Sequence, residues 1–141
     1  MEMEPALAPN IILSDGAIRE AGTNKISLIG TFNNVNARVF PFNIGFFVTP
    51  SISNLRGKLD RLKVAIRVED KSSSLVVASA AIEIGSPTDV KPSDVVQIPM
   101  PVACSFGSAG VYSVVVLVQN EVIGARDLTV SPVTAAPDIP T

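Results

Sequence analysis

The sequence predicts an all-β protein built as a single antiparallel β-sandwich. The chain is 47% hydrophobic and only 17% charged, with much of the excess supplied by valine, and β-branched residues favour strands. Short segments of alternating apolar and polar residues recur, while none keeps the 3.6-residue period of a helix. Two extended runs between Gly110 and Val130 flank the polar pair Asn120-Glu121, as in a β-hairpin. A small closed barrel is the structural alternative.

The length of the chain, 141 residues, corresponds to one domain. A domain of this size buries roughly two-thirds of its unfolded surface, so a core can form without disulfides or metal. Both ends are rich in proline, which cannot join an interior ladder. We therefore predict an N-terminal tail over residues 1–9, a sandwich domain over residues 10–131 and a proline-rich C-terminal tail over residues 132–141.

Eight segments have the length and composition of strands. In chain order they cover residues 10–18, 25–33, 44–49, 61–69, 75–84, 94–106, 111–118 and 122–130. Gly22 and Asn24 suit the turn between the first two, residues 70–74 read as a hairpin loop, and Phe40-Pro41-Phe42 lies in a loop before the third.

The apolar parity of each segment indicates which face points inward. In residues 25–33 the sequence places Ile26, Leu28, Gly30 and Phe32 on one face. In residues 61–69, the cleanest alternation of the chain, it places Leu62, Val64, Ile66 and Val68 on one face. Pro99 and Pro101 fall on the outer face of the segment 94–106, which is tolerable only near an edge or a bulge because two ladder donors are missing.

Tyr112 refines the fold class. Gly110-Val111-Tyr112 precedes a valine-rich strand, as in the tyrosine corner of immunoglobulin-like sandwiches, where the hydroxyl binds backbone a few residues upstream. We therefore predict an immunoglobulin-like sandwich of about seven to nine strands. A ligand contact is the alternative role for Tyr112.

Composition excludes several functions. The chain has no histidine and one cysteine, so Ser-His and Cys-His nucleophiles and thiolate metal clusters are absent. The net charge of −2 provides no drive toward nucleic acid. No apolar run approaches a membrane span, and the start lacks the pattern of a secretory signal. We expect no catalytic residue, cofactor, metal, nucleic acid or membrane partner, and a cytoplasmic location.

The acidic residues do not form a recognisable site. Calcium would need Glu69, Asp70, Asp89 and Asp94 to converge, whereas solvated turn acids are the simpler interpretation. A carboxylate-based hydrolase is not excluded by spacing alone. The lack of tryptophan and the single tyrosine argue against sugar platforms and base stacking.

A basic stretch lies in the middle of the chain. Residues 56–71 hold six of the eleven basic residues, and Arg61, Lys63 and Arg67 share one strand face. This face is either a docking surface for an acidic partner or a solvated face that discourages edge pairing. Cys104, by its parity with Val102 and Phe106, is expected in the core.

Three apolar residues point away from the predicted core. Val115 and Leu117 lie opposite the face that carries Tyr112, and Phe47 lies opposite Phe46 and Val48. An uncovered outer face of this kind often marks self-association or partner binding. Coverage by a terminal segment or a loop is the alternative.

Three stretches resemble a known family. They are Ile12-Leu13-Ser14-Asp15 followed by Lys25-Ile26-Ser27-Leu28-Ile29-Gly30, the amphipathic Leu62–Glu69, and Gly110-Val111-Tyr112 with its hairpin to Val130. In order and spacing they resemble small bacterial β-sandwich proteins known only as a domain of unknown function. Asn120-Glu121 departs from the Asp-Gly turn that such hairpins favour. The resemblance implies no activity, and it leaves Asp15 without a role.

The leading functional hypothesis is therefore a non-catalytic interaction or structural module. It would work through a sheet face or edge, with a homodimer or another protein as partner. The alternative is small-ligand or glycan binding by loops near Asp15, Phe40–Phe42 and Pro87–Pro92.

Overall fold

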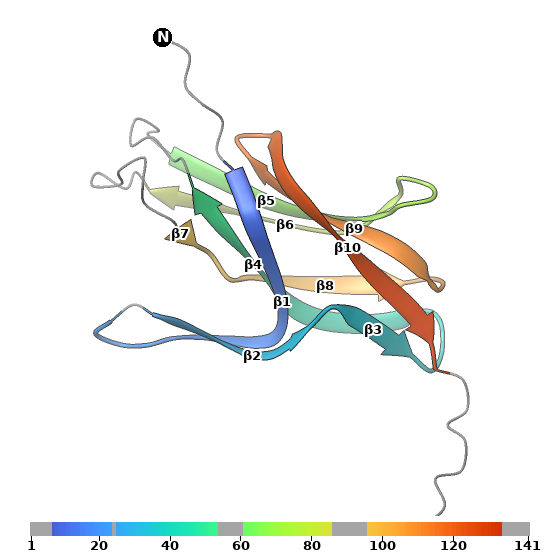
Figure 1. The fold of residues 1–141 in the computed structure, drawn as a ribbon. Helices are drawn as coiled ribbons and strands as arrows, with labels where there is room; N and C mark the ends of the chain where they lie inside the picture. Colours follow the sequence, from blue (N-terminus) through green and yellow to red (C-terminus); the bar gives the residue numbers. More distant parts are fainter. Residues whose placement is uncertain (1–6, 24, 54–60, 86–95, 134–141) are drawn as a thin grey trace, which may run out of the picture.

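The computed structural model describes residues 7–23, 25–53, 61–85 and 96–133. These residues form two five-stranded sheets packed face to face, and they contain no helix (Figure 1). Accordingly, the described part of the chain has no helix long and apolar enough to cross a membrane. Most of the two predicted tails, residues 1–6 and 134–141, lies outside the described residues.

The first sheet, here called sheet A, is antiparallel. It contains β1 (Leu7–Arg19), β2 (Ile26–Phe32), β4 (Phe42–Ser53), β7 (Val96–Gln97) and β8 (Met100–Phe106). β1 and β4 form its centre, β2 borders β1, and β7 and β8 both pair with β4. The turn end of the β1–β2 hairpin projects beyond the other strands (Figure 1).

The second sheet, here called sheet B, includes the hairpin predicted from Gly110–Val130. It contains β3 (Asn34–Ala37), β10 (Glu121–Pro132), β9 (Gly110–Val118), β5 (Arg61–Asp70) and β6 (Val76–Gly85), in that spatial order. β9 lies at its centre, so the most valine-rich strand is flanked on both sides. The all-β sandwich predicted from the sequence is confirmed.

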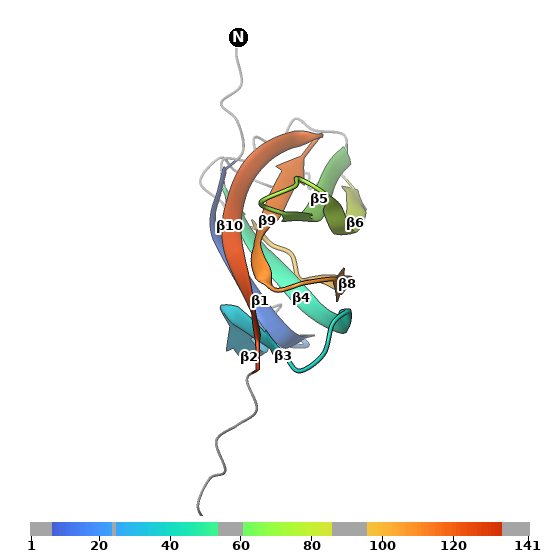
Figure 2. The same cartoon turned by 90° about the vertical axis from the view of Figure 1, so that its right-hand side faces the viewer.

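The core lies between the sheets and follows the predicted parities. Val64, Ile66 and Val68 of β5 are fully buried, as are Val114 and Val116 of β9. Cys104 and Tyr112 also belong to the core cluster. Along one side of the sandwich β1 and β10 run beside each other, and on the opposite side β6 approaches β8 (Figure 2).

The strand count and one pairing differ from the prediction. There are ten strands rather than seven to nine, because β3 forms where a loop was expected and residues 94–106 give two strands. β3 pairs parallel with the end of β10, so the sandwich is not purely antiparallel. Its sequence, NVNA, has little strand propensity of its own, and it is a strand because β10 supplies partners.

The segment 94–106 is interrupted before Pro99. The gap at residues 98–99 separates β7 from β8, and proline cannot donate to a ladder. Pro101 lies within β8 and pairs with Phe47 on β4. The sequence predicted that these prolines lie near a sheet edge or a bulge. β8 pairs only with β4 and is therefore an edge strand. The prediction of an edge position is confirmed for Pro101.

The β9–β10 turn is made by Gln119-Asn120, not by Asn120-Glu121. Val118 pairs with Glu121, and Gln119 and Asn120 have φ values of 51° and 67°. Positive φ at both central residues is typical of a type I′ turn, which matches the twist of the flanking strands. The hairpin was therefore predicted correctly, but the predicted turn lies one residue C-terminal to the observed turn.

Candidate interaction face and an adjoining pocket

Within the strands, the described residues on the outer face of sheet A carry no charge; the nearest charges on this side are Glu20 and Lys25, which are paired at the β1–β2 turn end. Side chains along a strand point alternately to the two faces of the sheet. Leu13, Val48 and Val102 are buried and face the core, so the residues that alternate with them face outward. They are Asn10, Ile12, Ser14, Gly16, Ile18, Ser27, Ile29, Thr31, Asn43, Gly45, Phe47, Thr49, Ser51, Gln97, Pro101, Ala103 and Ser105. We call this surface the uncharged face.

Several apolar residues of the uncharged face are open to solvent. Ile18 and Ile29 are 53% and 52% exposed. Phe47, which the sequence singled out, is half-buried and lies between Ser14 on β1 and Pro101 on β8. Apolar residues of this face thus occur from β2 to β8, interspersed with small and uncharged polar residues.

Three small residues with hydroxyl groups are the least exposed positions of the uncharged face. Ser14, Thr49 and Ser51 are buried although they point outward. Ser14 Oγ donates to the Gly16 carbonyl at 3.0 Å, and Gln97 Nε2 donates to Ser51 Oγ at 3.2 Å. Within the described ranges, Thr49 Oγ1 has no hydrogen-bond partner.

The outer face of sheet B is different. Val115 and Leu117 do point outward, since they lie outside the core cluster, but they are only 6% and 9% exposed. Arg67 and Ala125 lie on either side of Val115 in the sheet. Because β9 is the central strand, its neighbours cover these two side chains, and they present little surface to a partner.

Lys63 and Arg67, two of the three predicted basic residues, lie on this second outer face. Arg67 forms an ion pair with Glu69, and Lys63 lies opposite Glu83 on β6. Arg61 begins β5, but its side chain lies outside the described residues. Acidic neighbours therefore interrupt the basic row, and a role in binding an acidic partner stays a prediction.

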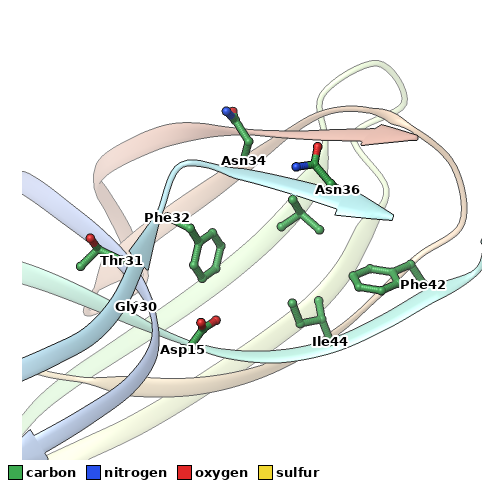
Figure 3. A pocket seen from close by; sticks show the side chains of 9 residues that line it. Asp15, Gly30, Thr31, Phe32, Asn34, Asn36, Phe42 and Ile44 are labelled. Atoms are coloured by element: carbon green, nitrogen blue, oxygen red, sulfur yellow. The ribbon is translucent and has the colours of Figure 1, made fainter. Parts of the chain in front are cut away.

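A pocket of about 260 Å³ opens where β1, β2, β3 and the start of β4 meet (Figure 3). Its walls are mixed: Phe32, Val35, Phe42 and Ile44 supply apolar surface, and Thr31, Asn34 and Asn36 supply polar groups. Asp15 is the charged residue that lines it. Figure 3 shows the Asp15 carboxylate turned toward the side on which Phe32 and Ile44 lie, while the Asn34 and Asn36 amides point away.

Asp15 and Gly30 meet at the pocket, although they belong to two separate sequence motifs. β1 and β2 pair in a register that places Ser14 opposite Thr31 and Gly16 opposite Ile29. A Cβ on Gly30 would lie 2.6 Å from Asp15 Oδ2. Gly30 also has a φ of +68°, which favours glycine. A glycine at position 30 therefore makes room for the Asp15 carboxylate.

The other acidic residues do not assemble into a site. Across the described ranges, no group of three or more Cys, Asp or Glu side chains is placed to hold a metal ion. Asp89 and Asp94, two of the four acids considered for calcium, lie outside the described residues, as does Pro87–Pro92.

Comparison with known families identifies the chain. A family model described as a family of unknown function (DUF6941) matches residues 10–131. The chain belongs to this family. Membership in DUF6941 confirms the resemblance that the motifs at residues 12–15, 25–30 and 110–130 predicted. No curated protein matches the sequence.

Two solved structures are similar to this DUF6941 member at low identity. An immunoglobulin-like protein from Pseudomonas aeruginosa is 12% identical, with a TM-score of 0.37, and the match covers 91% of this chain and 98% of that one. A β-glucuronidase from glycoside hydrolase family 2 is 13% identical, with a TM-score of 0.47 over 63% of this chain. The chain spans about a tenth of the glucuronidase, 10%, and neither likeness carries an argument about function.

The uncharged face was not found from the sequence. It could have been noticed by counting charges at alternate positions of the segments 10–18, 25–33 and 44–49, where Lys25, at the end of its row, is the charged residue of the outward parity.

The pocket was found in part. The ligand-binding alternative named Asp15 and Phe40–Phe42, and Asp15 and Phe42 do line the pocket. Its remaining walls come from strands whose neighbours the sequence does not specify.

Proposed function

We propose that this chain is a non-catalytic protein-interaction module that docks through the uncharged face of sheet A, with a second copy of the chain as its partner. The observation that carries the proposal is the contrast between the two outer faces. The strands of sheet A present apolar residues such as Ile29, Phe47 and Pro101 without a charge, whereas sheet B presents Lys63 and Arg67. Exposed apolar residues gathered on one face often mark interaction sites.

A second copy suits this face for a simple electrostatic reason. In a two-fold symmetric dimer the same patch occurs on both subunits, so any charge near the axis meets its own sign. A face without charges avoids that repulsion. Homodimer interfaces are also more apolar than ordinary protein surface and are depleted in charge at their centre.

The shape of the uncharged face supports sheet-on-sheet contact. Gly16, Gly45 and Ser14 lie among the larger Ile12 and Phe47, so small and large side chains are interspersed. Two such sheets can interdigitate at the spacing of about 10 Å that is usual for packed sheets.

The proposed absence of catalysis has separate support. The sequence contains no histidine, which removes the commonest general base. We place the protein in the cytoplasm, in keeping with its free and buried Cys104.

Sedimentation equilibrium tests the proposal. We expect the wild-type chain to be dimeric at high micromolar concentration and Ile29→Asp to be monomeric, because the substitution places a charge on the uncharged face of each copy. Val122→Asp is the matched control, since Val122 is 58% exposed at the turn end of β10 in sheet B, and it should remain dimeric. A monomeric wild-type chain, or equal weakening by both substitutions, would contradict docking through sheet A.

A further inference from the structure

The pocket beside Asp15 adjoins the proposed docking face at Thr31 and opens on the inner side of sheet A. We propose that it binds a compact organic cation with an apolar stem, that is, an alkylammonium or alkylguanidinium group. The ligand chemistry follows from a carboxylate without a counter-charge, from apolar and aromatic walls, and from the size of the cavity.

The first step is the direction of Asp15. Leu13 is buried in the core, and Asp15 has the same strand parity two residues further along β1. The side chain therefore points to the inner side of sheet A, at the end of the sandwich where the pocket opens (Figure 3). Asp15 is exposed to solvent, so its carboxylate is open to a ligand at the mouth of the pocket.

The second step is the missing partner. Among the described residues, no cation lines the pocket, and the Asp15 carboxylate has no hydrogen bond or ion pair. Arg126 lies on the neighbouring β10, but its guanidinium is bound to the Ile11 carbonyl and to Asn33 Oδ1. The carboxylate is thus available to a positive group that enters from outside.

The third step concerns the walls. The Phe32 ring meets the Phe46 ring edge to face, with centroids 5.4 Å apart. Phe42 and Ile44 are partly buried and pack against the core. The walls are therefore held by the core, and aromatic faces attract cations in addition to covering an apolar stem.

The fourth step is the size of the ligand. A volume of about 260 Å³ lies below the roughly 300–1,000 Å³ of pockets for drug-sized molecules. It suits a short alkyl chain with a cationic head. Such a group occurs in small free amines and in the side chains of lysine and arginine, and the chemistry of recognition is the same for both sources.

Gly30 shows that the chain accommodates the carboxylate at this point. Its positive φ and the 2.6 Å approach of Asp15 Oδ2 to a Cβ at this position both favour glycine. A side chain at position 30 would displace the carboxylate from the pocket wall. Asp15 and Gly30, which belong to two motifs separate in the sequence, thus lie against each other at the pocket.

Titration of the full chain with n-butylguanidinium, followed by amide NMR shifts, tests the proposal. We expect saturable shifts at Gly30, Asn34 and Ile44, and binding weakened by high salt. The neutral analogue n-butylurea should bind about five- to tenfold more weakly, because it lacks the charge that Asp15 recognises. Equal binding of the two compounds, or no saturable shift, would overturn the proposal.

Variants assign the effect to the pocket. Asp15→Asn should weaken n-butylguanidinium binding about five- to tenfold, whereas Glu121→Gln, an exposed acid at the β9–β10 turn, should leave it unchanged. If Asp15→Asn does not fold, Phe42→Leu keeps an apolar wall and should weaken binding by removing one aromatic face. Retained affinity in the folded variant contradicts the proposal.

A comparison of probes separates the two sources of the cation. Acetyl-arginine methylamide presents the same head group with the peptide backbone that a protein partner would have. Tighter binding of this compound than of n-butylguanidinium points to a protein side chain, and the reverse order points to a small free cation.

Discussion

Tyr112 shows how a single residue connects the two ends of a turn. Its ring is buried against Phe106, with centroids 4.7 Å apart, and its hydroxyl donates to the Ser108 carbonyl at 2.7 Å. The predicted structural corner is confirmed. The sequence was sufficient here because donor and acceptor are only four residues apart.

Removing the Tyr112 hydroxyl should destabilise the fold modestly. We expect Tyr112→Phe to lower the free energy of unfolding by about 1 kcal/mol, the usual net value of one hydrogen bond. Urea denaturation measures the change, with an unaltered m-value as the sign that the fold itself is retained. An unchanged midpoint would show that solvent satisfies the Ser108 carbonyl equally well.

Cys104 is a core residue, as its parity predicted. Burial raises the pKa of its thiol from 9.0 to about 12. Between those values the unfolded chain has lost the thiol proton while the folded chain keeps it. The free energy of unfolding should therefore fall as pH rises from about 9 to about 12, and this contribution is fully present below pH 9.

The pH dependence can be isolated with one substitution. Comparing urea unfolding of the wild type and Cys104→Ala at several pH values above about 8 cancels the titration of lysine and tyrosine. We expect the wild type to lose more stability with rising pH than the variant does. Parallel curves would show that the thiol titrates normally in the folded chain.

At the scale of elements, Arg126 connects the two sheets. It projects from β10 and donates to the Ile11 carbonyl at 2.9 Å and to Asn33 Oδ1 at 2.8 Å. The β1–β2 pairing ends at Leu13 and Phe32, so β1 has no β2 partner at Ile11. Arg126 occupies this place, where the chain passes from sheet A to sheet B.

Loss of this contact should be costly. We expect Arg126→Met to lower the free energy of unfolding by about 2 kcal/mol, since charged groups make the stronger hydrogen bonds. Arg67→Met is the matched control, because Arg67 pairs with Glu69 on the open face of sheet B and should lose less than about 1 kcal/mol. Similar losses in both variants would argue against a special role for Arg126.

The β9–β10 turn offers a stabilising change. Asn120 has a φ of 67°, which a glycine adopts without the steric cost that other residues meet. We expect Asn120→Gly to raise the free energy of unfolding by about 0.5–1 kcal/mol, and with it the thermal midpoint. Asn120→Ala should lower both. The opposite order in differential scanning calorimetry would contradict the type I′ assignment.

For the whole molecule, the two outer faces determine how association should respond to salt. Docking through the uncharged face buries strand residues of the described ranges that carry no charge, and the nearest pair on this side, Glu20 and Lys25, has opposite signs, so salt screening has little effect. We expect the dimer dissociation constant to change less than about threefold between low and high NaCl, measured by sedimentation equilibrium. A change of ten times or more would implicate the charged face of sheet B instead.

Much of the fold could be predicted, but less of the candidate site. The inward positions of Val64, Ile66 and Cys104 follow from the two-residue period of a strand, which is a local property. The burial of Val115 and Leu117 does not, because it depends on which side chains of β5 and β10 lie beside them. Phe47 was recognised as outward-facing, but its uncharged surroundings come from strands distant in the sequence.

Eight strand segments, their inner faces, the corner at Tyr112 and the lack of histidine chemistry followed from residue type and short-range spacing alone. Strand β3 and its parallel pairing with β10, the contact of Arg126 with Ile11, the meeting of Asp15 with Gly30 and the contrast between the two outer faces became visible only in the folded molecule. Each of these depends on which strands lie side by side, and long-range packing selects those neighbours whereas local periodicity does not encode them.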